Sequence, residues 1–175
     1  NLNFEQMENR QIVGWQLGTK DISPYTLTAD SETVTEGAHS LTIHSASAAP
    51  EAWAIAWQRV AVGAYQGQQI RLTAQVKTDS VSGEASAGLE YNGRNFFNSP
   101  RDRATSPALT GTNDWTKIEL FLNLAEGTET INFFFALEGT GQIWVDDVRL
   151  EAVGPSTWRR EHEKIKNYLN EALDI

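Results

Sequence analysis

The chain has 175 residues, of which 40% are apolar and 21% charged, as expected for one globular domain with a sizeable core. Its formal net charge of −9 argues against nucleic acid and anionic membrane surfaces as partners, because phosphate contacts need clustered Lys and Arg. Cysteine is absent, which excludes disulfides and thiolate metal sites, and no apolar run approaches the ~20 residues that a membrane-spanning helix requires.

Short strands separated by turn residues recur through residues 1–151. The expected strands, in chain order, are Asn1–Gln6, Ser40–Ser45, Ala52–Val60, Gln69–Thr78, Ala85–Tyr91, Thr116–Leu122, Thr130–Leu137 and Ile143–Leu150. Within residues 69–78 apolar and polar side chains alternate, as in a sheet with one face in solvent. Strands at this spacing with no helix between them predict an all-β antiparallel sandwich, a jelly roll, over residues 1–152, in which the first and last strands pair.

The pattern changes after this domain. We interpret residues 153–157 as a linker, and residues 158–175 as an amphipathic helix, because Trp158, Ile165, Leu169 and Leu173 fall on one stripe. No secretory signal precedes Asn1, and no stop signal ends the helical pattern. We therefore expect a piece of a longer protein, with the helix beginning a following domain.

Aromatic residues give the first candidate site. Alternation along residues 52–60 places Trp53 and Trp57 on one strand face with an arginine, and such a face is either core or a platform on which sugar rings stack. The long stretch 91–109, expected to be irregular, adds Tyr91, Arg94 and Phe96, and long loops in compact domains tend to be functional. These five residues are the predicted carbohydrate-binding set.

Carboxylates give the second candidate site. Glu5 in the first expected strand, and Asp146 and Asp147 in the last, lie among apolar residues and need hydrogen-bond partners or a cation. Hard oxygen ligands suit calcium, with a carbonyl near Ser40 as a further donor. If the apolar residues that follow point inward, Asp146 is the buried member of the pair. The alternative is that these acids cap backbone amides or pair with Arg149.

Few patterns in the sequence indicate catalysis. The three histidines, His39, His44 and His162, lack metal-ligand spacing, and no nucleophile elbow or phosphate-binding loop is present. We therefore predict a module that is not an enzyme.

Six segments in order carry a resemblance to a known family: Phe4–Glu5, Gly37–Leu41, Trp57–Val60, Leu72–Thr78, Gly111–Trp115 and Gly141–Glu151. Together they resemble the galactose-binding-like jelly roll of carbohydrate-binding modules of the family 4 and 9 kind. The resemblance implies a sandwich of eight to ten strands that often carries a structural calcium. Carried onto this chain, it implies Glu5, a carbonyl near Ser40 and one of Asp146 or Asp147 as calcium ligands.

A narrower resemblance is to the amino-terminal module of secreted bacterial serine peptidases of the tricorn and carboxy-terminal-processing type. It implies a secreted, periplasmic or cell-surface location, and a catalytic serine outside this chain. We predict a domain that binds polysaccharide or oligosaccharide for a secreted multidomain hydrolase. The alternative is an accessory domain that binds no glycan and packs on a downstream peptidase domain through residues 158–173.

Overall fold

The computed structural model describes the chain except for residues 10, 20–24, 48–51, 94–100, 126 and 158–175. Its strands are β1 (Met7–Glu8), β2 (Gln11–Ile12), β3 (Gln16–Thr19), β4 (Thr26–Asp30), β5 (Ser40–Ser45), β6 (Trp53–Ala61), β7 (Gln68–Gly93), β8 (Arg101–Thr105), β9 (Leu109–Asn123), β10 (Thr128–Glu138) and β11 (Gly141–Pro155), with a 3-10 turn, η1 (Gly63–Tyr65), after β6. Within the described residues no helix is long and apolar enough to span a bilayer.

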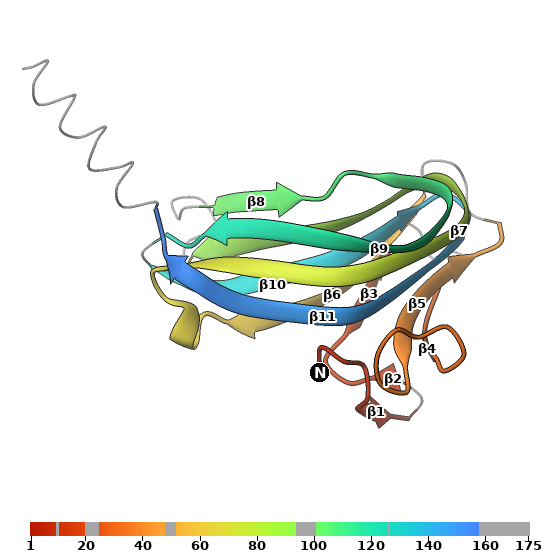
Figure 1. The fold of residues 1–175 in the computed structure, drawn as a ribbon, viewed down its shortest axis with the longest axis horizontal. Coiled ribbons are helices and arrows are strands. Elements are labelled where there is room, and N and C mark those ends of the chain that lie inside the picture. The colour runs from red at the N-terminus through yellow and green to blue at the C-terminus, as the bar shows by residue number, and fades with distance from the viewer. Residues whose placement is uncertain (10, 20–24, 48–51, 94–100, 126, 158–175) are drawn as a thin grey trace, which may run out of the picture.

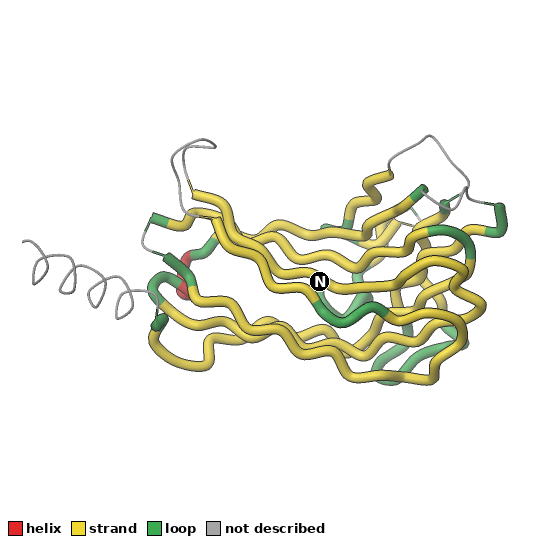
Figure 2. The backbone as a smooth tube through the Cα atoms, turned by 90° about the horizontal axis from the view of Figure 1, so that it is seen from above, coloured by secondary structure: helices red, strands yellow, loops and turns green. Residues whose placement is uncertain are grey.

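The 26-residue strand β7 belongs to two layers. Residues 68–79 pair with β11 and residues 69–85 with β9, while residues 85–93 pair with β10 and residues 88–92 with β8. The hydrogen-bonded path β3-β6-β10-β7-β11-β5-β4 therefore folds over on β7 into an antiparallel sandwich (Figures 1 and 2). We call the layers the β10 sheet (β3-β6-β10-β7-β8) and the β11 sheet (β4-β5-β11-β7-β9).

The core lies between the two sheets. Every second residue of β10 points inward, and Ile131, Phe133, Phe135 and Leu137 are at most 1% exposed. The indole of Trp15 packs against both of these phenylalanines, at 5.6 and 5.9 Å between ring centroids. Leu41 and Ile43 of β5 are fully buried from the opposite layer. The predicted all-β antiparallel sandwich is therefore confirmed.

The predicted opening strand, Asn1–Gln6, is wrong. The Asn1 side chain donates to the carbonyl oxygens of Gln6 and Val13, and Phe4 has a φ of 60°, which makes this segment a turn. The expected pairing of first and last strands fails for the same reason, because β11 pairs with β5 and β7 instead.

Other elements also differ from the sequence interpretation. The two strands expected at 69–78 and 85–91 are one strand, β7, and β8 interrupts the stretch 91–109 that was expected to be irregular. Strand β11 runs to Pro155, into the predicted linker, because Pro155 pairs with Gln68 and the amide of Ser156 donates to the Gly67 carbonyl. The predicted helix at 158–175 lies outside the described residues.

Candidate functional site

The outer face of the β10 sheet presents apolar side chains to solvent. On β6, Ala54 and Ala56 are fully buried, so their neighbours Trp53, Ile55 and Trp57 point outward. The side chain of Trp53 is 38% exposed, which is high for a large aromatic residue. The sequence left open whether this aromatic face belongs to the core or to the surface, and the structure shows that it is the outer face.

A groove of about 450 Å³ runs over this face. We call it the outer-face groove; its lining residues are Trp53, Ile55, Glu84, Ser86, Glu90, Arg103, Phe134, Ala136 and Glu138. They come from four neighbouring strands, β6, β10, β7 and β8. Apolar side chains from β6 and β10 form its floor, and charged or hydroxyl-bearing ones from β7, β8 and the end of β10 surround them.

Phe134 forms the centre of the floor because its neighbour on β7 is a glycine. The two residues are cross-strand partners, and a Cβ at Gly88 would lie 2.1 Å from the tip of the Phe134 ring. The ring therefore lies across β7. The Arg103 guanidinium sits over it, with Cζ 4.7 Å from the ring centroid, a distance within the cation–π range.

A polar chain crosses the sheet beside the groove. Arg59 Nε donates to Asn132 Oδ1 at 2.8 Å, and Asn132 Nδ2 donates to Glu90 Oε1 at 3.3 Å. Asn132 is only 7% exposed. A buried amide that uses both its oxygen and its nitrogen is fixed in orientation, and it restrains the carboxylate that it contacts.

The structure separates the predicted carbohydrate-binding residues. Trp53 lines the outer-face groove, and Trp57 lies on the same face as the cross-strand partner of Phe134. Tyr91 is 1% exposed and belongs to the core, so its ring does not join them. Arg94 and Phe96 lie outside the described residues.

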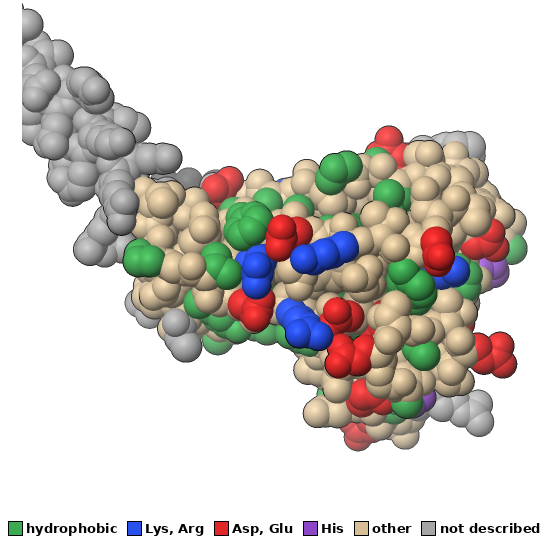
Figure 3. All heavy atoms as spheres, viewed as in Figure 1, with side chains coloured by type: hydrophobic (Ala, Val, Ile, Leu, Met, Phe, Trp, Pro, Cys, Tyr) green, Lys and Arg blue, Asp and Glu red, His purple; other side chains and the backbone are tan. Residues whose placement is uncertain are grey.

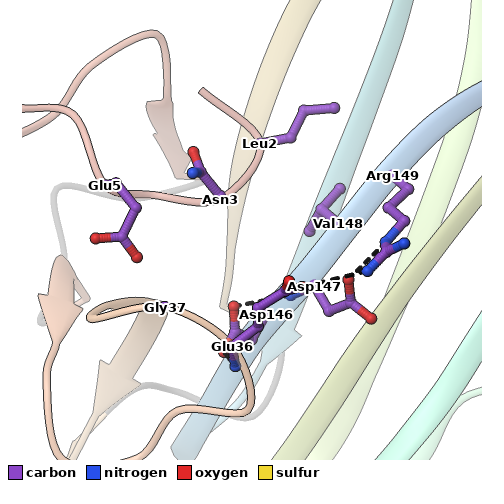
Figure 4. Close-up of a pocket in the computed structure, with 9 residues that line it drawn as sticks. All are labelled: Leu2, Asn3, Glu5, Glu36, Gly37, Asp146, Asp147, Val148 and Arg149. Atoms are coloured by element: carbon purple, nitrogen blue, oxygen red, sulfur yellow. Dashed lines mark hydrogen bonds and ion pairs between the residues drawn. The ribbon is translucent and has the colours of Figure 1, made fainter.

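The predicted calcium ligands Glu5 and Asp146 line a second hollow of about 600 Å³, which we call the N-terminal cleft. Figure 4 shows that three elements surround this cleft: the opening turn, strand β11, and the loop that precedes β5. Asp146 is 1% exposed, so it is the buried member of the aspartate pair. Its Oδ2 accepts hydrogen bonds from the amides of Thr35 (2.6 Å) and Glu36 (3.0 Å) and from the Thr35 hydroxyl, and its Oδ1 accepts one from the amide of Asp147.

Glu5 holds the next turn of the same loop. Its Oε1 accepts from the amides of Ala38 (2.8 Å) and His39 (3.2 Å), and its Oε2 lies 3.2 Å from His39 Nδ1. The Ala38 amide, followed by the contacts of His39, holds the pKa of Glu5 below its usual value. A lowered carboxyl pKa stabilises the fold at neutral pH, and that contribution is lost as the pH falls through the lowered pKa. Ser40 is buried, and its hydroxyl donates to the Thr33 carbonyl.

Every carboxylate oxygen of Glu5 and Asp146 therefore has a polar partner within hydrogen-bonding distance. Among the described residues, no three His, Cys, Asp or Glu side chains are placed to hold a metal ion. Calcium takes about six to eight oxygen ligands, and these side chains as arranged fit the capping of amides better than such a shell. The structure does not test the calcium that the sequence predicts; its arrangement favours the capping of amides, and a chelator distinguishes the two.

A chelator tests the calcium. A metal that binds only the native state raises its stability, so calcium held in the N-terminal cleft would make the melting temperature fall in EDTA. From the hydrogen-bonded arrangement we expect no change in the melting temperature, measured by calorimetry in EDTA and in excess Ca²⁺. A fall in EDTA that Ca²⁺ reverses would establish the metal instead.

The outer face of the β11 sheet has a different character. Figure 3 shows basic and acidic side chains intermixed over it. Arg71 pairs with Glu119 (3.6 Å) and Glu151 (2.8 Å), while Arg149 pairs with Asp147 and Glu36. Exposed ion pairs of this kind are typical of a solvated sheet face. The outer-face groove is therefore the stronger candidate site.

Sequence reasoning missed most of this groove, including Phe134, Glu90 and Arg103. The signal was present only in part. On β10 three consecutive phenylalanines follow Asn132, so the alternation that reveals an outer face is hidden. The pairing of Phe134 with Gly88 could not be predicted either, because the sequence does not give the register between β10 and β7.

No family model matches the chain. A curated relative, the uncharacterized HTH-type transcriptional regulator YbfP of Bacillus subtilis (strain 168), is 25% identical over 172 residues, which is 98% of this chain. The chain spans 58% of the length of that relative.

Solved structures with a similar fold include several carbohydrate-binding modules. The CBM22-1 xylan-binding domain of Paenibacillus barcinonensis has a TM-score of 0.59 at 14% identity, over 88% of this chain and 93% of that one. A family 16 carbohydrate-binding module has 0.61 at 15%, over 86% and 99%. The enzymatically active domain of the bacteriophage CBA120 tailspike protein 4 has 0.67 at 15%, over 87% and 22%. At these identities the similarity shows the fold.

Proposed function

We propose that the chain is a non-catalytic glycan-binding domain and that the outer-face groove binds the glycan. The observation that carries this proposal is the half-exposed Trp53 indole at the edge of a groove with an apolar floor and polar walls. Proteins bind sugar rings by stacking the apolar C–H face on an aromatic ring while polar side chains bond the hydroxyls. The outer-face groove offers both kinds of contact within about 450 Å³.

The solved structures of similar fold support the proposal. One is a xylan-binding domain, and others were determined with a β-1,4-galactotriose and with a mixed-linked β-1,3-1,4 tetrasaccharide. Their ligands differ, so the neighbours favour a saccharide without choosing one.

Affinity gel electrophoresis tests the proposal. The chain is run through native gels that contain one soluble polysaccharide each (xylan, β-1,4-galactan, hydroxyethylcellulose, mixed-linked β-glucan or laminarin), with and without calcium. We expect at least one polymer to retard the chain relative to bovine serum albumin. Retardation by none of them would contradict glycan binding and favour the accessory-domain alternative.

The context of the domain is a separate part of the proposal. The sequence predicted attachment to a secreted multidomain hydrolase, with packing on a downstream peptidase domain as the alternative. The residues of that contact, 158–173, lie outside the described part of the chain, so both stay predictions. The curated relative favours a second candidate, because it is a transcriptional regulator and matches almost the whole chain. In this candidate the domain senses a soluble saccharide for a DNA-binding partner.

Ligand length distinguishes the two contexts. A module that tethers an enzyme to a polymer gains affinity with each added sugar until the groove is filled, whereas a sensor needs only a short saccharide. Calorimetric titration with the di-, tetra- and hexasaccharide of the retarding polymer separates them. Rising affinity up to the hexasaccharide supports the tether, and full affinity at the disaccharide supports the sensor.

A further inference from the structure

Two opposite charges in the outer-face groove face each other without pairing. Glu90 on β7 and Arg103 on β8 are direct cross-strand partners, and both line the groove. Opposite charges in this relation attract each other, and an ion pair between them would stabilise the pair of strands. In the described part of the chain each makes a different contact instead.

Each side chain is held by a neighbour on β10. The carboxylate of Glu90 accepts from Asn132 Nδ2, and Asn132 is itself fixed by Arg59. The guanidinium of Arg103 lies over the Phe134 ring, 4.7 Å from its centroid. That ring lies where it does because Gly88 has no side chain. Two residues of one strand, Asn132 and Phe134, thus hold the acceptor and the donor apart.

A hydrogen-bond acceptor and a donor that lie on adjacent strands but do not pair with each other suit one chemical group in particular. A carboxylate only accepts hydrogen bonds and a guanidinium only donates them, whereas a hydroxyl does both. Of two hydroxyls on adjacent carbons, one can donate to Glu90 while the other accepts from Arg103. Both bonds involve a charged group, and such bonds are roughly twice as strong as neutral ones.

We propose that Glu90 and Arg103 form a vicinal-diol site, and that the outer-face groove therefore selects glycans whose residues keep two adjacent free hydroxyls. This inference rests on the proposed glycan binding and names the class of glycan. Internal residues of 1,4-linked xylan or glucan keep free hydroxyls at C2 and C3. Internal residues of a 1,3-linked glucan carry the linkage at C3, so no adjacent pair is free. The groove thus prefers 1,4-linked chains, and Asn132 and Phe134 are positioning residues.

The first test changes the ligand. Periodate cleaves the C–C bond between adjacent hydroxyls, and borohydride then reduces the aldehydes, which leaves an uncharged polymer without vicinal diols. We expect the chain to bind xylan or β-1,4-galactan at least tenfold more weakly after this treatment, and to bind laminarin at least tenfold more weakly than the untreated 1,4-linked polymers. Equal affinity before and after oxidation would overturn the diol site while leaving glycan binding intact. Binding to no polymer at all would overturn both.

The second test changes the protein. If Glu90 and Arg103 bind the same diol, Glu90→Gln and Arg103→Leu should each weaken binding about tenfold, and the double variant should be little weaker than either. Losses that multiply to about a hundredfold would show independent contacts and contradict the shared diol. Asn132→Leu should weaken binding similarly, because Glu90 is then free to pair with Arg103. Gln16→Ala, exposed on β3 of the same sheet and outside the groove, should leave the affinity unchanged.

Discussion

Replacing Asp146 with asparagine is expected to lower the free energy of unfolding by about 2–4 kcal/mol. The carboxylate is buried and accepts four hydrogen bonds, three of them from the backbone amides of Thr35, Glu36 and Asp147. An asparagine keeps the shape, but it offers a single oxygen and turns its NH₂ group toward an amide N–H. A buried donor left without an acceptor costs about 1–3 kcal/mol.

Urea denaturation at pH 7 measures this effect, and Asp147→Asn is the matched control. The neighbouring carboxylate pairs with Arg149 at the surface, where an ion pair contributes about 0–1 kcal/mol. Its φ of 48° is also one that asparagine tolerates well. Equal losses for Asp146→Asn and Asp147→Asn would contradict the role of Asp146 in holding the loop before β5.

Replacing Trp53 with alanine should weaken glycan binding at least 30-fold and leave the melting temperature nearly unchanged. A buried aromatic anchor in a binding site contributes about 2 kcal/mol or more, which corresponds to roughly a 30-fold change in affinity. The indole is 38% exposed in the free chain and lies outside the core, so its removal leaves no internal cavity. Calorimetric titration with the retarding polysaccharide, together with a thermal melt, checks both parts.

Trp57→Ala is the control for this substitution. The indole lies on the same face but does not line the outer-face groove, and the guanidinium of Arg59 sits 5.6 Å from its ring centroid. We therefore expect a smaller loss of affinity than for Trp53→Ala. If both variants bound as well as the parent chain, the outer face of the β10 sheet would not be the ligand site. If either variant lost about 3–5 kcal/mol in the free energy of unfolding, the tryptophan it replaces would be a core residue instead.

Local patterns in the sequence were enough to predict the sandwich and one residue of the groove. Alternation along β6 separated Trp53 and Trp57 from the small residues Ala54 and Ala56, and only the direction of the two faces stayed open. The same rule applied to β7 would place Tyr91 beside Leu89, on the inward face, where the structure has it. Tyr91 was predicted as a ligand contact because it was grouped with the loop that follows it.

The parts that sequence could not predict depend on contacts between distant strands. Strand β7 is continuous across both layers, and no local signal distinguishes one long strand from two short ones. The groove combines Phe134 with Gly88 and Glu90 with Arg103, and those pairs follow from the register alone. The sequence identifies Glu5 and Asp146 as acids in need of partners, but four of the five backbone amides that donate to them belong to one distant loop, residues 35–39.

The most direct test of glycan binding in the outer-face groove is a ¹⁵N NMR titration that follows the indole N–H signals of the six tryptophans. Cellohexaose and xylohexaose are the probes. We predict that the Trp53 signal shifts as ligand is added. The signals of Trp15 and Trp144, whose indole nitrogens donate to the Asn1 carbonyl and to Asp30, should stay in place. A Trp53 signal that is unmoved while either of those two shifts would place the ligand elsewhere and contradict the proposed site.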